Sequence, residues 1–157
     1  MIRKQLTEKN LKGVIKADYK PNLDEFICQC EVNYSLIIKL LPWLNLSKHD
    51  LNATFRQKVV EFRPKSGHKI DLHLIDRAKY TTTMILRVHS PSRSNETNMN
   101  LTIRLYHDAK LLEVMDRAGS KALQPVNRGS ALLTKQADEK RQLNRFLGES
   151  LKYCLSS

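Results

Sequence analysis

The sequence contains little of what usually marks specialised folds or chemistry. Aromatic residues make up 6% of the 157 positions, with one tryptophan, and glycine and proline occur five times each. There is no internal repeat or low-complexity tract, no helix-turn-helix signature, no zinc knuckle and no RNP-like aromatic pair. The glycines are too dispersed for a phosphate-cradling loop, because such a loop needs several of them within a few residues. These absences exclude the common motif-based nucleotide and nucleic-acid binders.

Cysteine is also scarce. The three cysteines, Cys28, Cys30 and Cys154, are an odd number, and all fall inside apolar helical patterns. They are therefore expected to be reduced, buried thiols and not a disulfide framework. Cys28-Gln29-Cys30 has no second pair of ligands to complete a four-ligand zinc site, so we favour core cysteines over a metal role. We expect no metal and no cofactor.

Long apolar runs are missing as well. The basic N-terminus, MIRKQLTEKNLKGVIKADYK, has no apolar run long enough for a signal peptide, and no segment reaches the length of a membrane span. The sequence therefore predicts a soluble, cytoplasmic protein that does not bind membranes.

Basic residues, in contrast, are abundant. Lys and Arg number 27 against 16 Asp and Glu, a formal net charge of +11. Such an excess makes anionic partners worth considering: nucleic acid, phosphorylated ligands or an acidic protein surface. An ordinary solvated basic surface explains the charge equally well. The apolar content of 41% and the length are typical of one globular domain.

The order of patterns predicts an α+β fold. Residues 1–18 have many charges and no sustained period, which predicts a basic flexible tail ahead of a single domain over residues 19–157. Asn22, followed by Asp24 and Glu25, is a helix start, and apolar residues then recur every three or four positions until Pro42. The stripe consists of Leu23, Phe26, Ile27, Cys30, Tyr34, Ile37, Ile38 and Leu41.

The period then changes to two, which indicates strands. Strand-like segments cover Thr54–Phe62, Ile70–Leu74, Tyr80–Val88 and Leu101–Tyr106, and a further strand begins at Leu112. Short connections imply antiparallel pairing, so we expect a meander of four to five strands. Residues 90–98 and 117–133 are interpreted as loops, the second with one short strand at most. A second amphipathic helix is predicted from about Lys135 to the end, and two helices on one sheet face would give two layers.

Four segments also carry a family resemblance. These segments are, in chain order, YKPNLDEFICQCEVNYSLIIKLLP, KYTTTMI, LTIRLYHDAKLLEV and DEKRQLNRFLGESLKYCL. This order is typical of the YqiB-like family of uncharacterised gamma-proteobacterial proteins, which the chain resembles from Tyr19 to Leu155. Asp76 and Lys79 depart from the Glu and Arg expected there, and Ser150 replaces a frequent Trp. The resemblance implies no established activity.

His107-Asp108 is the pair that most resembles a catalytic or metal-binding site. A catalytic His oriented by a carboxylate also needs a nucleophile or a metal, and adjacent residues in a turn point in divergent directions. The remaining histidines are scattered over loops and different strands. We therefore favour a hairpin connection at residues 106–110, with Asp108 bonding backbone amides, over a catalytic or metal site.

Two further groups are candidate anion sites. Arg104 and Tyr106 share one strand face, and with Lys79, Tyr80 and the His107-Asp108 pair they could bind a phosphate or planar anion. We favour cross-strand packing on a solvated sheet face over such a site.

On the last helix, Arg141, Arg145 and Lys152 share a face that could follow a phosphate backbone, although an ordinary solvated face fits the same spacing. We interpret the protein as a non-enzymatic binding or regulatory module for an anionic ligand or protein partner. The alternatives are an enzyme acting on a nucleotide or other phosphorylated substrate, with Arg104, Tyr106, His107 and Asp108 as its only plausible site, and a weak binder of nucleic acid without sequence specificity.

Overall fold

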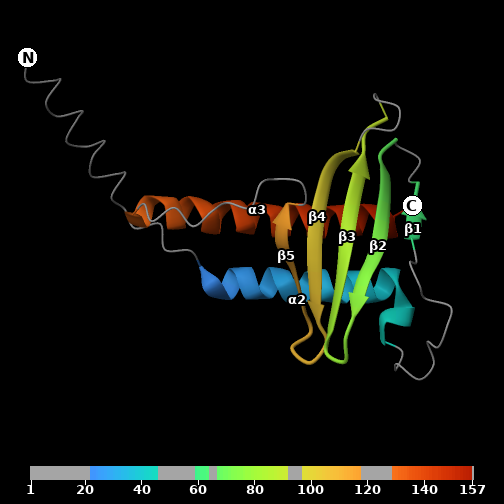
Figure 1. Ribbon diagram of the computed structural model, residues 1–157, viewed down its shortest axis with the longest axis horizontal. Coiled ribbons are helices and arrows are strands. Elements are labelled where there is room, and N and C mark those ends of the chain that lie inside the picture. Colours follow the sequence, from blue (N-terminus) through green and yellow to red (C-terminus); the bar gives the residue numbers. More distant parts are fainter. Residues whose placement is uncertain (1–21, 46–58, 64–66, 92–96, 118–128, 157) are drawn as a thin grey trace, which may run out of the picture.

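The computed structural model describes residues 22–45, 59–63, 67–91, 97–117 and 129–156, and it is a two-layer α+β domain (Figure 1). Five antiparallel strands form one sheet in the order β1-β2-β3-β4-β5, and two helices lie across one of its faces. This confirms the predicted fold class. The predicted tail at 1–18 and the predicted strand residues 54–58 lie outside the described residues. The elements are α2 (Leu23–Leu40), the 3-10 helix η1 (Pro42–Asn45), β1 (Val59–Phe62), β2 (Lys69–Arg77), β3 (Thr81–His89), β4 (Thr97–Tyr106), β5 (Leu111–Arg117) and α3 (Gly129–Leu155).

The start and end of α2 follow from the residues at its ends. The Asn22 side chain accepts a hydrogen bond from the Glu25 backbone N–H at 3.2 Å, which satisfies one of the donors at the start of a helix. Pro42 cannot continue the helical hydrogen bonding, and η1 begins there. Both predicted ends are confirmed. The predicted apolar stripe is too wide, however, because Leu23 and Ile27 are 66% and 38% exposed.

The alternation of the strands places one set of side chains against the helices. Thr82, Met84, Leu86 and Val88 are buried, whereas their neighbours along β3 are only partly covered. In β4, the buried set is Leu101, Ile103 and Leu105, which confirms the two-residue period predicted for both strands. Together with Leu72, Leu112 and Val114 from β2 and β5, these side chains form the sheet half of the core.

Two predicted loops are too long. The helix α3 begins at Gly129 and not near Lys135, because Ala131, Leu132 and Leu133 are strong helix formers that extend the helix toward its N-terminus. Likewise, Thr97 already belongs to β4 and pairs with His89 of β3, as suits a β-branched residue. The glycine, proline and polar residues around these segments concealed their regular structure.

A buried polar network joins α2, α3 and β5. The Asn144 side-chain oxygen on α3 accepts a hydrogen bond from the Val114 backbone N–H at 3.0 Å. The Asn144 backbone carbonyl accepts a second hydrogen bond from the Asn33 side-chain amide, also at 3.0 Å. Gly148 allows the two helices to approach, since a Cβ there would lie 2.7 Å from the Asn33 Oδ1 atom. Polar groups thus fix how α2 and α3 pack on this edge of the sheet.

The three cysteines are free thiols in different surroundings. Burial raises the pKa of both Cys30 and Cys154 to about 12, so these two remain protonated. The prediction that Cys28 is buried is wrong, because it lies on the exposed face of α2. Among the described residues, no helix is long and apolar enough to cross a membrane, and no group of three or more His, Cys, Asp and Glu could hold a metal ion.

Candidate functional site

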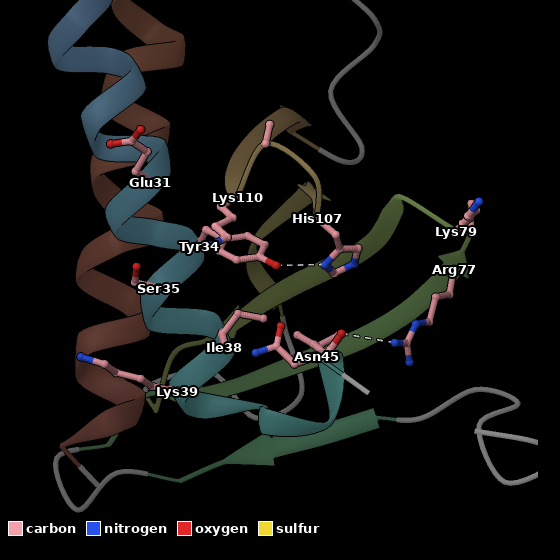
Figure 2. Close-up of a pocket in the computed structure, with 13 residues that line it drawn as sticks. Glu31, Tyr34, Ser35, Ile38, Lys39, Asn45, Arg77, Lys79, His107 and Lys110 are labelled. Atoms are coloured by element: carbon pink, nitrogen blue, oxygen red, sulfur yellow. Dashed lines mark hydrogen bonds between the residues drawn. The ribbon is translucent and has the colours of Figure 1, made fainter. Parts of the chain in front are cut away.

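A cavity at the surface of the described domain lies where α2 passes over two turns of the sheet. It has a volume of about 800 Å³ and is bounded by the second half of α2, by η1, by the β2–β3 turn and by the β4–β5 turn (Figure 2). We call it the α2 cleft. Its polar lining residues are Glu31, Tyr34, Ser35, Lys39, Asn45, Arg77, Lys79, His107 and Lys110, and its apolar ones are Ile38, Leu44, Ala78 and Ala109.

Local hydrogen bonds hold the two turns against each other. In an antiparallel meander, the β2–β3 and β4–β5 turns lie at the same end of the sheet. The Ala78 backbone N–H closes the first turn on the Thr81 carbonyl at 2.8 Å, and the His107 N–H donates to the Tyr80 carbonyl at 2.8 Å. The second turn covers residues 107–110 and ends at Lys110, whose φ of 54° is left-handed. The predicted hairpin connection at residues 106–110 is thus confirmed, whereas the hydrogen bonds expected from Asp108 to backbone amides stay a prediction.

His107 forms the floor of the α2 cleft. Its Nδ1 atom lies 3.1 Å from the Tyr34 hydroxyl of α2, and its Nε2 atom lies 2.7 Å from the Thr82 hydroxyl of β3. Figure 2 shows the Tyr34 phenol reaching across from the helix to the imidazole. Burial, and secondly the charge of Arg77, lower the pKa of His107, whereas Asp108 acts weakly in the opposite direction. The imidazole is therefore neutral at pH 7, with one ring nitrogen donating and the other accepting.

Four basic side chains surround this floor, and three elements supply them. Lys39 comes from the last turn of α2, Arg77 and Lys79 from the end of β2 and its turn, and Lys110 from the β4–β5 turn. The Arg77 guanidinium donates to the Leu44 carbonyl at 3.2 Å, which ties β2 to η1. Within the described part of the chain, no carboxylate lies within ion-pair distance of Lys39, Lys79 or Lys110.

The structure divides the first set of predicted ligand-binding residues between two faces. Lys79 and His107 line the α2 cleft, and Asp108 lies exposed in the turn beside it. Tyr80, 53% exposed, stands in the β2–β3 turn, where the Lys79 ammonium lies 4.8 Å from the centre of its ring. The six candidates therefore do not converge on one site.

Arg104 and Tyr106 share a strand face, as predicted, but it is the face away from the helices. The Arg104 Nε–H donates to the Thr83 hydroxyl at 3.3 Å, and the Tyr106 hydroxyl donates to Glu113 at 3.1 Å. These contacts are the cross-strand packing that we favoured from the sequence.

The basic face of α3 is occupied by carboxylates. Arg141 donates to both carboxylate oxygens of Glu25 at 3.0 and 3.1 Å, and Arg145 donates to the same carboxylate at 3.0 Å. Lys152 pairs with Glu149 of its own helix at 3.2 Å. Each of the three predicted cations of the stripe thus has an acidic partner, and two of them connect α3 to the start of α2.

Sequence reasoning missed Tyr34, Lys39, Arg77 and Lys110 as members of the site. Arg77 and Lys110 carried a usable signal, because both flank turns that a meander brings to the same end of the sheet. Tyr34 belongs to the apolar stripe of α2, and its role depends on where that helix crosses the sheet. The local pattern does not contain that information.

Comparisons with known proteins place the chain among uncharacterised relatives. A family model described as "Protein of unknown function (DUF1249)" matches residues 37–157. The "Uncharacterized protein YqiB" of Escherichia coli strain K12 is 29% identical over 143 residues, which cover 88% of this chain and 91% of that protein. Its counterpart in Escherichia coli O157:H7 matches equally well. No solved structure gives a significant match. The resemblance inferred from the four segments is confirmed.

Proposed function

Since the chain belongs to the DUF1249 family of proteins of unknown function, we propose its function from its site: a binding module that holds a small anionic ligand in the α2 cleft, without catalysis. One observation carries the proposal. Lys39, Lys79 and Lys110, supplied by three separate elements, line one cavity, and in the described region none of them has a carboxylate partner.

Electrostatics explains why this arrangement suits an anion. Like charges around a cavity repel one another, and solvent reduces this repulsion here because all three lysines are exposed. Among the described residues, Glu31 is the only acidic one that lines the cleft, and Arg77 adds a further positive charge. A bound phosphate or carboxylate would remove the repulsion and accept charge-assisted hydrogen bonds. The volume of about 800 Å³ also lies within the range of small-molecule sites.

The geometry of His107 favours binding over turnover. The contact of 2.7 Å between its Nε2 atom and the Thr82 hydroxyl has the spacing of a base and a nucleophile. Thr82 is fully buried under the helices, however, so its hydroxyl cannot reach a substrate in the cleft. The other ring nitrogen is engaged by Tyr34, and Asp108 lies exposed in the turn. The His107 imidazole therefore supports the cleft and shapes its floor.

Titration calorimetry with pyrophosphate at low ionic strength tests the proposal. The double variant Lys79→Gln/Lys110→Gln removes two charges from the cleft, and Arg145→Gln/Lys152→Gln removes two exposed charges from α3 as a matched control. We expect the cleft variant to bind about tenfold more weakly or worse, since two charge-assisted contacts are lost. The α3 variant should bind like wild type, and circular dichroism should show both folded. Absent pyrophosphate binding, or equal loss in both variants, would contradict the proposal.

A further inference from the structure

The distribution of charge within the α2 cleft narrows the chemical class of its ligand. Resting on the proposed function, we infer that the ligand carries two anionic groups separated by a neutral spacer, with one group held at Lys39 and the other at Lys79 and Arg77. A bisphosphorylated small molecule, such as a sugar bisphosphate, has this chemistry.

The first support is the placement of the cations. Lys39 belongs to α2, whereas Arg77 and Lys79 belong to the end of β2 and its turn, and Figure 2 shows these two groups on opposite sides of the cleft. The exposed side chains of Lys39 and Lys79 extend outward in this view, so each would turn inward to contact a ligand. A cation and an anion pair only when their atoms are within about 4 Å of each other. A single phosphate at one side would therefore leave the other side without an anion, whereas two separated groups serve both.

The second support is the neutral region between them. Ile38 and Asn45 lie between Lys39 and Arg77 in Figure 2, and both line the cleft. The floor is the Tyr34 hydroxyl and the His107 imidazole, which carry no charge at pH 7, and the charged Lys110 stands at the β4–β5 turn that bounds the cleft. An apolar side chain with neutral hydrogen-bonding groups beside it suits a hydroxylated spacer and leaves additional anionic groups without a partner.

The third support is Glu31, which limits how far the negative charge of the ligand can extend. It lies on α2 two turns before Lys39, so the helix presents an acid toward one end of the cleft and a base toward the other. A continuous polyanion such as a nucleic-acid strand would bring phosphates against this carboxylate. A ligand with two discrete anionic groups avoids it.

Two sugar phosphates that differ in one phosphate test the inference. Fructose 1,6-bisphosphate and fructose 6-phosphate are titrated by calorimetry into wild type and into Lys39→Gln, Lys79→Gln and, as the control, Lys152→Gln. We expect the bisphosphate to bind wild type at least tenfold more tightly than the monophosphate does. The affinity for the bisphosphate should fall about tenfold with either Lys39→Gln or Lys79→Gln, because each substitution removes the partner of one phosphate. The monophosphate should respond to only one of them, and Lys152→Gln should change neither ligand.

The outcomes separate this inference from the function on which it rests. Equal affinity for the two sugar phosphates, or a bisphosphate affinity that Lys39→Gln does not change, would overturn the inference of a ligand with two anionic groups. The proposed anion-binding function of the cleft would still stand. Binding of pyrophosphate without binding of either sugar phosphate would overturn the neutral spacer. Tighter binding of heparin than of the bisphosphate, sensitive to the same substitutions, would instead identify a polyanion. If pyrophosphate does not bind either, the proposed function itself is refuted.

Discussion

Two regions of this protein are rich in basic side chains, and they differ in what those side chains contact. Along α3, Arg141 and Arg145 meet Glu25 of α2, and Lys152 meets Glu149. In the described part of the chain, three lysines line the α2 cleft together with a single acidic residue, and none of the three has an ion-pair partner there.

This difference shows that the contacts of basic residues indicate their role better than how many there are or how they are spaced in the sequence. On α3 the cations form part of the packing between two helices, next to the buried network of Asn33 and Asn144. In the cleft, the lysines make no comparable contribution to the fold. Removing polar groups from the first region should therefore destabilise the protein, whereas changes in the second should alter ligand binding.

The largest effect is expected for Asn144→Ala. This change leaves the Val114 backbone N–H on the edge strand without its acceptor and removes the amide that donates to the Lys140 carbonyl at 2.8 Å. A buried donor left unsatisfied costs about 1–3 kcal/mol, so we expect a loss near the upper end of that range. Urea unfolding followed by circular dichroism measures it. The control is Gln142→Ala on the exposed side of the same helix, for which we expect less than about 0.5 kcal/mol. Equal losses in the two variants would show that the network does not hold α3 in place.

A smaller effect is expected when the carboxylate shared by the two arginines is neutralised. Glu25→Gln should lower the free energy of unfolding by less than about 1 kcal/mol, because the ion pairs are largely exposed. It should also increase the binding of double-stranded DNA, with a stronger dependence on salt, because Arg141 and Arg145 lose this partner. The matched control Glu31→Gln should leave stability unchanged and strengthen pyrophosphate binding instead. If wild type and Glu25→Gln bind DNA equally well, the ion pairs do not mask the α3 face.

The smallest effect concerns pH. Burial and Arg77 lower the pKa of His107 in the folded chain, so the unfolded chain takes up a proton first as the pH falls through about 6.5. The free energy of unfolding should therefore decrease below that pH, until the folded imidazole is protonated as well. His73, whose pKa is lowered by burial and then by Arg87, contributes in the same direction. In His107→Gln the decrease between pH 7.5 and 5 should be shallower. Parallel stability curves for variant and wild type would contradict the assignment.

The parts of the fold that follow from local pattern were predictable. Alternation along β3 and β4 identified the face that packs on the helices, and the Asn22 cap and Pro42 identified the ends of α2. The turn at His107 was predictable because polar residues stand between two apolar strands. These features depend on residues that are neighbours in the sequence, so the local residue pattern is enough to predict them.

The site depended on packing that local pattern does not describe. Tyr34 reaches His107 only because α2 crosses the sheet over the β4–β5 turn, and Arg77 meets Leu44 only because η1 follows at that point. The spacing of Arg141 and Arg145 was correct, yet it could not reveal that Glu25, more than a hundred residues away, occupies both. Chemistry assembled from separate elements therefore required the structure.

The most direct test of the central claim, that the α2 cleft and not the α3 face binds anions, is a pyrophosphate titration of the ¹⁵N-labelled protein followed by amide chemical shifts. We predict saturable shifts at Lys39, Lys79, His107 and Lys110, whose positions surround the cleft, with the amides of Arg145 and Lys152 unmoved. Shifts confined to Arg145 and Lys152, or small unsaturable shifts spread over all basic residues, would contradict it.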